Sequence, residues 1–411
     1  MTASIYSRLS TMMFLQFFVW GAWFVTLGTY LNALGFSGTD IASAYLTNNI
    51  GAIIAPFFAG LVADRFFASQ KVAGVMHLFG AGVLYYATTL SGAGEMIVWL
   101  LVYNAAYMST LALANSISFA QMTDPDLQFP KVRVWGTIGW IVAGLAISLV
   151  LATRFADVEA THIPMTMAAI ASALLGIYCF TLPDTPPPAR GRAVGVADIL
   201  GLDALTLFRD RAFAVFAVCS LLICVPLAFY YSFANLYLND LGMQGAAGKM
   251  TLGQMSEALF LLAMPFFFRR LGVKWMLLVG MIAWVVRYVL FAYGSLDWVG
   301  LLYLGILLHG ICYDFFFVTG QIYVDRKASA DTRASAQGLI TLLTYGVGMA
   351  VGTYIAGVVV DALSTPDGYA WDTLWLIPGG FAAVVAALFA LTFNDSSADE
   401  PVDTAPQGVS S

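Results

Sequence analysis

Long apolar segments recur along the whole chain and limit the possible folds more than any other feature of the sequence. Hydrophobic residues make up 60% of the 411 residues, and charged residues only 10%. About 20 apolar residues can cross the roughly 30 Å hydrocarbon layer of a membrane as a helix. Backbone groups in lipid must bond within the protein, and these segments lack the alternation of barrel strands. The sequence therefore predicts an all-α membrane protein with twelve transmembrane helices, at about 9–33, 41–63, 72–91, 96–120, 132–153, 163–182, 212–238, 250–268, 275–294, 298–324, 334–360 and 372–393.

The distribution of basic residues supports this number of helices and gives their orientation. Lysine and arginine collect on the cytoplasmic side of membrane proteins. Only Arg154 and Lys249 fall on the opposite side if both termini are cytoplasmic, and Arg287 lies inside a segment. We therefore expect a multi-pass membrane protein with cytoplasmic N- and C-termini. The other fifteen of the 18 basic residues then lie on the cytoplasmic side: Arg8, Arg65, Lys71, Lys131, Arg133, Arg190, Arg192, Arg209, Arg211, Arg269, Arg270, Lys274, Arg326, Lys327 and Arg333.

The longest polar interruption follows the sixth apolar segment and divides the chain into two similar parts. It begins Asp184-Thr185-Pro186-Pro187-Pro188, and residues 196–208 within it have the periodicity of a surface helix. Two six-helix halves joined by a cytoplasmic linker resemble the layout of the major facilitator superfamily, whose substrate site lies near the membrane midplane between the halves. The expected parts are an N-terminal half at 1–182, a linker at 183–211, a C-terminal half at 212–393 and a disordered cytoplasmic tail at 394–411.

Two glycine motifs indicate close helix packing. Gly60-Leu61-Val62-Ala63-Asp64-Arg65 resembles a cytoplasmic Gly-x-x-x-Asp-Arg motif of that superfamily, in which Asp64 can cap a helix or pair across the two halves. The alternative interpretation is an ordinary charge pair in a loop. Gly348, Gly352 and Gly357 predict small-residue packing of the eleventh segment against its neighbours.

Four ionisable residues, Arg133, Glu257, Arg287 and Asp314, interrupt the otherwise apolar segments. A charge at bilayer depth costs roughly 2.5–3.5 kcal/mol in insertion experiments, so such residues usually mark a transport pathway or a binding site. This pattern is typical of a transporter. The four cysteines all fall within predicted segments and indicate neither a disulfide framework nor a metal site.

The fifth segment carries a possible ligand-binding stripe. Arg133, Thr137 and Trp140 stand at i, i+4 and i+7, on one face of a helix. A guanidinium fork, a hydroxyl and a large aromatic face suit a flat, polar ligand such as a base or a sugar ring. Alternatively, Arg133 is a boundary residue whose side chain extends to the cytoplasmic surface.

The eighth segment carries a second possible contact. Gln254 and Glu257 lie on one helix face, and an amide beside a carboxyl offers both donors and acceptors to a sugar hydroxyl or a base edge. Burial favours the neutral form of a carboxyl, so Glu257 is also a candidate proton carrier. The alternative is a permanent ion pair between Glu257 and Arg287, in which Arg287 has a structural role.

In the tenth segment Asp314 lies in an aromatic run, Tyr313-Asp314-Phe315-Phe316-Phe317. A lone carboxyl there has little structural use, which makes Asp314 a candidate proton carrier; alternatively, Arg133 or a backbone group satisfies it. His309, more than one turn earlier, is more typical of a packed polar residue. Interhelical hydrogen bonds explain most other amides in the segments, Asn48, Asn49, Asn104, Asn115 and Gln321.

A series of short motifs matches those of one transporter family: Phe14-Leu15-Gln16-Phe17, Trp20-Gly21-Ala22-Trp23, Thr26-Leu27-Gly28-Thr29-Tyr30, residues 133–139, Gly201-Leu202-Asp203-Ala204, Gln254-x-x-Glu257, Ala283-Trp284-x-x-Arg287, Phe291-Ala292-Tyr293-Gly294, Asp314-Phe315-Phe316 and Arg333-Ala334-Ser335-Ala336-Gln337-Gly338. Through these motifs the sequence resembles the nucleoside:H⁺ symporter family of the major facilitator superfamily, over all twelve segments. The resemblance implies that Arg133, Thr137, Trp140, Gln254, Glu257 and Asp314 line the substrate site. It also implies a place in the bacterial cytoplasmic (inner) membrane.

One departure from the family concerns the seventh segment. Two family amides that contact the nucleoside correspond here to Ala228 and Tyr231. The change removes hydrogen-bonding capacity and adds aromatic surface next to the expected site. Because an unpaired polar partner costs about 1–3 kcal/mol, such a site discriminates between substrates differently.

The predicted function is proton-coupled import of nucleosides, or a closely related sugar-containing solute, by alternating access. The alternative within transport is a carrier for another polar metabolite, such as a sugar, an amino sugar or a cell-wall fragment. A non-transporting membrane sensor is a more distant alternative. A membrane enzyme is not expected, because the sequence contains no His-Glu-x-x-His motif, no nucleophile elbow and no phosphate-binding loop. The expected partners are a small-molecule substrate and membrane lipid, with no nucleic acid polymer and no cofactor besides the coupling proton, and a monomer is expected.

Overall fold

The chain folds almost entirely into helices. The computed structural model describes residues 1–63, 67–186, 202–329, 332–366 and 368–395. Two strands, β1 (Ser364–Thr365) and β2 (Gly368–Tyr369), pair in an antiparallel hairpin. The helices before the linker are α1 (Ala3–Phe24), α2 (Leu27–Ala33), α3 (Gly38–Ala63), α4 (Ser69–Ala87), α5 (Ala93–Ala120), α6 (Pro125–Leu145), η1 (Ala146–Val150), η2 (Leu151–Thr153), η3 (Val158–Ala160) and α7 (Ile163–Cys179). After it come η4 (Leu202–Arg209), α9 (Arg211–Asp240), α10 (Ala246–Ala292), α11 (Val299–Leu307), α12 (His309–Tyr313), η5 (Asp314–Val318), α13 (Thr319–Lys327), α14 (Arg333–Thr341), η6 (Leu342–Gly348), α15 (Met349–Ala362) and α16 (Trp371–Thr392).

The predicted apolar segments all fall on these helices. In the described chain eight helices are long and apolar enough to cross a membrane. One of them, α10, contains two predicted segments, which meet at Gly272 with φ 67° and ψ 178°. Glycine adopts this conformation at no steric cost, so the chain bends there and continues as a second helix. Part of the surface helix predicted at 196–208 lies outside the described residues, and its described end belongs to the short 3₁₀ helix η4.

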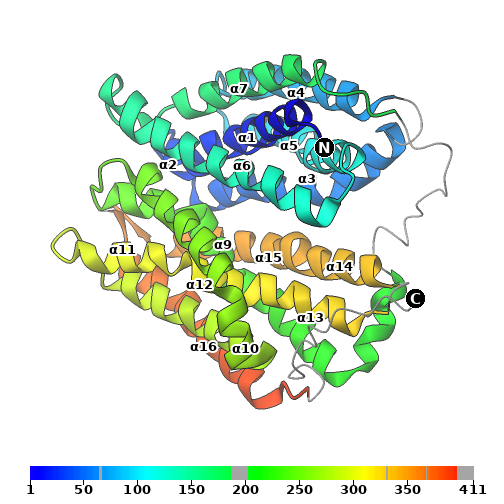
Figure 1. Ribbon diagram of the computed structural model, residues 1–411. Helices are drawn as coiled ribbons and strands as arrows, with labels where there is room; N and C mark the ends of the chain where they lie inside the picture. Colours follow the sequence, from blue (N-terminus) through cyan, green and yellow to red (C-terminus); the bar gives the residue numbers. More distant parts are fainter. Residues whose placement is uncertain (64–66, 187–201, 330–331, 367, 396–411) are drawn as a thin grey trace, which may run out of the picture.

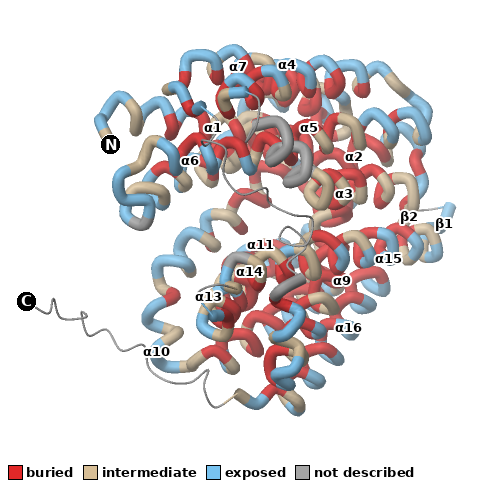
Figure 2. The backbone as a smooth tube through the Cα atoms, turned by 90° about the vertical axis from the view of Figure 1, so that its right-hand side faces the viewer, coloured by how far each residue is buried: buried red, intermediate tan, exposed pale blue. Residues whose placement is uncertain are grey.

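The helices gather in two groups that face each other (Figure 1). The N-terminal group is α1–α7, in which α1 contacts α6, α3 contacts α5 and α4 contacts α7. The C-terminal group is α9–α16, in which α16 packs against both α9 and α10. Contacts of α3 with α15, α6 with α10 and α2 with α9 join the groups. Buried residues fill the interior of each group and continue across this junction (Figure 2).

The two ends of the molecule differ in how the groups meet. We name the end that carries Asp184 and Asp210 the linker end, and the end that carries Glu159 and Asp361 the far end. Two carboxylates bind across the groups at the far end. Asp361 of α15 accepts hydrogen bonds from the backbone N–H groups of Gly38 and Thr39 at the start of α3, at 2.5 and 2.9 Å.

Glu159 of η3 makes the reciprocal contact with the C-terminal group. Helix α10 starts after Gly245 in the left-handed conformation and has no capping side chain of its own. Glu159 replaces that cap, because both of its carboxylate oxygens accept from the N–H of Ala247, at 3.0 and 3.1 Å. The side chains of Asn235 and Asn239 also donate to Glu159, at 2.8 and 3.0 Å. Each group thus caps a helix of the other.

Glycines allow the close approach at these contacts. A Cβ on Gly357 would lie 2.5 Å from the Ala42 side chain, and one on Gly248 would lie 2.7 Å from that of Ser148. The predicted small-residue packing of the eleventh segment is confirmed: Gly348 and Gly352 lie against α9, and Gly357 lies against α3.

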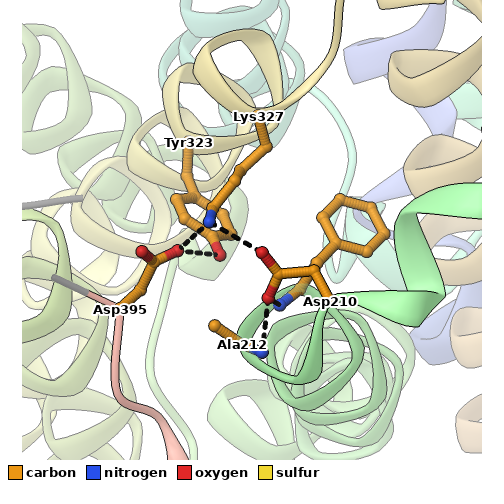
Figure 3. A network of polar contacts seen from close by, with 6 residues as sticks. Asp210, Ala212, Tyr323, Lys327 and Asp395 are labelled. Carbon is orange, nitrogen blue, oxygen red and sulfur yellow. Dashed lines mark hydrogen bonds and ion pairs between the residues drawn. The ribbon is translucent and has the colours of Figure 1, made fainter. Parts of the chain in front are cut away.

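A polar network closes the linker end of the C-terminal group (Figure 3). Asp210 caps α9 by accepting from the N–H groups of Ala212 and Phe213. Lys327, at the end of α13, contacts both Asp210 and Asp395, at 2.9 and 2.5 Å. The hydrogen bond from Lys327 is the main reason that the pKa of Asp210 lies below its ordinary value. These contacts hold together the start of α9, the end of α13 and the segment after α16. Among the described residues we find no hydrogen bond between the two groups at this end.

Candidate functional site

A cavity of about 320 Å³ lies between the two groups, within the size range of small-molecule sites. Both groups contribute to its wall, in which aromatic side chains and polar or charged side chains are equally frequent. The lining residues are Phe17, Trp20, Phe24, Asn48, Asn49, Ala52, Met108, Leu111, Arg133, Thr137, Trp140, Tyr231, Gln254, Glu257, His309, Tyr313, Tyr345 and Met349.

The predicted stripe of α6 faces this cavity. Arg133, Thr137 and Trp140 all contribute to its wall. The Arg133 guanidinium carbon lies 4.0 Å from the centre of the Phe17 ring, a cation–π contact that directs the side chain toward the cavity. Trp140 packs edge-on against Trp20, with ring centroids 5.5 Å apart. The stripe therefore offers one cation, one hydroxyl and one aromatic surface.

Helix α10 supplies the facing wall. Gln254 and Glu257 line the cavity one turn apart, and the Glu257 side chain is 28% exposed. The backbone of α12 lies close to this turn, because a Cβ on Gly310 would be 2.6 Å from the Ser256 carbonyl. Arg133 and Glu257 thus present opposite charges to one cavity from opposite groups.

The ion pair considered for Glu257 and Arg287 is not direct. The described residues contain no salt bridge between the two side chains. His309 lies between them, with its Nδ1 3.2 Å from Arg287 Nη1 and its Nε2 3.7 Å from Glu257 Oε2. Arg287 is fully buried, and its guanidinium carbon lies 3.3 Å from the centre of the Tyr230 ring.

Asp314 lies behind the cavity wall. It begins the π-helical turn η5, is 1% exposed and does not line the cavity. Its Oδ2 atom is buried and has no hydrogen-bond partner among the described residues. Such π-helical turns within longer helices are frequent at functional sites. The neighbouring Tyr313 does reach the cavity, where its hydroxyl accepts a 2.6 Å hydrogen bond from Tyr345.

The two altered positions of α9 have different surroundings. Tyr231 lines the cavity, with its ring 6.3 Å from that of Phe24. Ala228 is fully buried and faces Gly352 of α15, where a Cβ on the glycine would be 3.0 Å from the alanine methyl. In this structure only Tyr231 can contact a ligand in the cavity.

Several lining residues were not predicted from the sequence. The sequence predicts interhelical hydrogen bonds for Asn48 and Asn49. Within the described chain, however, the side-chain oxygen of Asn48 has no hydrogen-bond partner, and Asn49 reaches Thr353 only at 3.4 Å. The only sequence feature that could have indicated their place in the cavity wall is that two amides stand side by side in an apolar segment. The aromatic lining residues Phe17, Trp20 and Phe24 have the spacing of ordinary helix packing and gave no separate signal.

Most of the predicted Gly-x-x-x-Asp-Arg motif lies where the structure gives no side-chain contacts. Gly60 lies in α3, but its surroundings, together with Asp64 and Arg65, lie outside the described residues. Within the described chain no group of three or more His, Cys, Asp or Glu residues could hold a metal ion.

Known proteins with similar sequences are transporters, as the cavity between the two groups suggests. Residues 3–398 match the family model described as nucleoside H⁺ symporter. In Escherichia coli (strain K12), the protein YegT is 46% identical, over 95% of this chain and 94% of its own. The xanthosine permease is 36% identical, over 95% and 96%. The nucleoside permease NupG is 33% identical, over 97% and 98%.

Solved structures give the same result. The crystal structure of the nucleoside transporter NupG has a TM-score of 0.87 at 33% identity and covers 95% of this chain and 100% of that one. The structure of the POT family transporter PepTSo has a TM-score of 0.71 at 12% identity and covers 95% of this chain and 98% of that one, which shows the fold alone. The chain belongs to the nucleoside H⁺ symporter family, with the helical transporter fold predicted from its sequence.

Proposed function

We propose that the protein is a proton-coupled secondary transporter that imports nucleosides, or a closely related sugar-containing solute, by alternating access. The observation that carries the proposal is the cavity between the two groups, where Trp140 and Tyr231 offer aromatic faces and Arg133, Gln254 and Glu257 offer hydrogen-bonding groups. A nucleoside combines a planar base with a hydroxylated sugar, so its chemistry matches both kinds of wall. The family and the permease relatives support this substrate class.

We further propose the membrane topology. Twelve transmembrane helices form two halves, residues 1–182 and 212–393, joined by a cytoplasmic linker at 183–211. Both termini and the linker end then face the cytoplasm of a bacterium, as the distribution of basic residues predicts. In this orientation the far-end contacts of Glu159 and Asp361 hold the outer side closed. The protein acts as a monomer in lipid and needs no cofactor besides the proton.

The residue roles follow from position and chemistry. Arg133, Thr137 and Gln254 hydrogen-bond polar edges of the solute, while Trp140 and Tyr231 pack against its ring. Glu257 accepts a hydrogen bond from a sugar hydroxyl. Asp314 carries the coupling proton. Its burial and the lack of a partner for its Oδ2 among the described residues support this role. Burying an isolated carboxylate costs far more free energy than burying a neutral carboxyl, so the protonated form is favoured there.

Uptake by proteoliposomes tests this function. Vesicles containing the purified protein receive tritiated uridine under an inward proton gradient with a negative interior. One charge moving through 100 mV is worth roughly 2.3 kcal/mol, which supports about fortyfold accumulation of a neutral solute. A protonophore should abolish accumulation, and vesicles without protein give the background. Accumulation that survives the collapse of both gradients contradicts proton coupling. If labelled sugars are taken up and nucleosides are not, the carrier is one for another polar metabolite.

A further inference from the structure

A buried chain of polar contacts borders the cavity on the side of the C-terminal group. It runs from Arg287 in the second part of α10, through His309 of α12, to Glu257 in the first part of α10. Arg287 is 0% exposed and His309 is 2% exposed, whereas Glu257 reaches the cavity. Among the described residues no carboxylate forms a salt bridge with Arg287. The imidazole is therefore a hydrogen-bonding partner of this buried cation, which also interacts with Tyr230 and Cys312.

The contact with Arg287 determines which hydrogen-bonding group His309 presents to Glu257. A guanidinium only donates hydrogen bonds, so Nδ1 of His309 must accept from Arg287 Nη1. The hydrogen of the neutral ring then lies on Nε2, the atom nearest to Glu257 Oε2. A doubly protonated ring would direct an N–H at the guanidinium. The arrangement therefore presents one N–H donor to the carboxylate.

Packing fixes the position of the ring. His309 stacks on Tyr230 at a centroid distance of 5.5 Å, and the Arg287 guanidinium covers the same tyrosine ring. A Cβ on Gly253 of α10 would lie 3.1 Å from the His309 Cβ, so the two helices are in close contact here. The hydroxyl of Ser256 also donates a 2.6 Å hydrogen bond to the Leu307 carbonyl, just before α12. The imidazole is thus held in place before any solute binds.

We propose that His309 is a positioning residue for Glu257: its Nε2–H, set by Arg287, holds the charged carboxylate toward the cavity, where it accepts a hydroxyl of the solute. This inference rests on the proposed function. The present 3.7 Å separation is longer than a hydrogen bond, and such contacts tighten in the complex with substrate. Protonation of Glu257 removes the charge that the N–H attracts and loosens the contact. Protonation of Glu257 and solute binding thereby act on the same pair of side chains.

Two substitutions separate positioning from packing. In His309→Asn the amide oxygen can take the place of Nδ1 and accept from Arg287, but no donor remains at the place of Nε2. In His309→Gln the amide nitrogen reaches the place of Nε2 and restores that donor. The Kd for tritiated uridine on the purified protein should rise about tenfold in His309→Asn and less than about threefold in His309→Gln. Equal losses in both variants mean that the ring only fills space, which overturns the proposal.

A double-mutant cycle tests whether His309 acts through Glu257. If it does, adding His309→Asn to Glu257→Gln should change the Kd by less than about twofold, because the group that it positions has already lost its charge. An undiminished tenfold effect in the Glu257→Gln background shows that His309 acts independently of Glu257 and also overturns the proposal. Size-exclusion profiles identify any variants that are misfolded. Among the variants that fold, the comparison of His309→Asn with His309→Gln still decides whether His309 positions Glu257 or only fills space.

A measurement without solute separates this inference from the proposed function. Infrared spectra recorded against pH follow the protonated carboxyl band of Glu257, identified by its loss in Glu257→Gln. The other charged or titratable groups that interact with Glu257 are Arg133 of α6, Tyr231 of α9, Tyr313 of α12 and Asp314 of η5, and they remain unchanged in the variants. The midpoint of the titration should differ from wild type by about one pH unit in His309→Asn, and by much less in His309→Gln. Identical midpoints in all three proteins contradict the proposal, whereas failure of the wild type to bind uridine contradicts only the substrate class.

Discussion

At the scale of single residues, Trp140 offers the cavity a large flat surface whose position is fixed by neighbouring rings. Trp20 and Phe24 both contact its ring edge-on, which limits its movement. Tyr231, on the opposite helix group, offers a smaller ring and a hydroxyl. If a base stacks here, the aromatic surface contributes more to affinity than the hydroxyl does.

We therefore predict that Trp140→Ala weakens nucleoside binding more than Tyr231→Phe does. The difference should be at least about 1 kcal/mol, since the alanine variant loses both an aromatic contact and apolar area. Equilibrium binding of tritiated uridine to the purified variants measures it. If Trp140→Ala binds normally, the stacking model is wrong and a non-planar sugar becomes the better candidate.

The two membrane carboxyls should have separable roles, because only one of them lines the cavity. Glu257→Ala removes a group that faces the solute and should abolish binding. Asp314→Asn changes a buried side chain behind the wall and should keep binding while it abolishes uphill uptake. Binding and proton-driven uptake, measured on the same preparations, test the division. Equal loss of binding in both variants rules it out.

At the scale of the helices, the network around Lys327 connects the start of α9, the end of α13 and the segment after α16 (Figure 3). Hydrogen bonding from Lys327 lowers the pKa of Asp210 in the folded protein. The contact therefore stabilises the fold above the ordinary aspartate pKa of about 3.9, and this stabilisation is lost as the pH falls through the lowered value.

Asp210→Asn should make thermal stability less dependent on pH in this acidic range. Asparagine caps a helix about as well as aspartate, so the substitution removes the ion pair and keeps the cap of α9. The loss at neutral pH should stay below about 1 kcal/mol, because the Asp210 side chain is 43% exposed and solvent weakens such pairs. Melting curves in detergent between acidic and neutral pH measure it. Identical pH dependence in the two proteins contradicts the prediction.

Helix positions and much of the cavity wall could be predicted from the sequence, because hydropathy and helical spacing are local properties. The spacing of Arg133, Thr137 and Trp140 placed them on one face, and that face lines the cavity. The burial of Ala228 against Gly352 could not be predicted in this way. It depends on how α9 rotates against a helix more than a hundred residues away. The contact of His309 with two parts of α10 depends on helix packing for the same reason.

At the scale of the whole molecule, the structure is closed at the far end by contacts between the groups. The charge of Glu159 strengthens its hydrogen bonds to the first turn of α10, where the helix dipole favours an anion. Glu159→Gln keeps the shape and removes the charge. The exposed Glu95, in the first turn of α5, provides the matched control, since Glu95→Gln removes the same charge from a helix start in the N-terminal group.

We predict that Glu159→Gln raises the fraction of molecules open at the far end by roughly fivefold, the factor for about 1 kcal/mol, whereas Glu95→Gln leaves it unchanged. Spin labels at the exposed positions Ala156 and Asp297 report the separation of the groups. The four native cysteines are buried, which limits background labelling. Indistinguishable distance distributions in wild type and Glu159→Gln contradict a role for this contact in closure.

The reciprocal form of the far-end contacts has a kinetic consequence. Glu159 belongs to the N-terminal group and caps α10, while Asp361 belongs to the C-terminal group and caps α3. If the groups rotate as rigid bodies, neither carboxylate can leave its helix without the other leaving as well. The outer side then opens in one cooperative event, and no species open on only one flank accumulates. Single-molecule records of the transporter should accordingly contain two states, and a substitution in either carboxylate should shorten the dwell time of the same closed state.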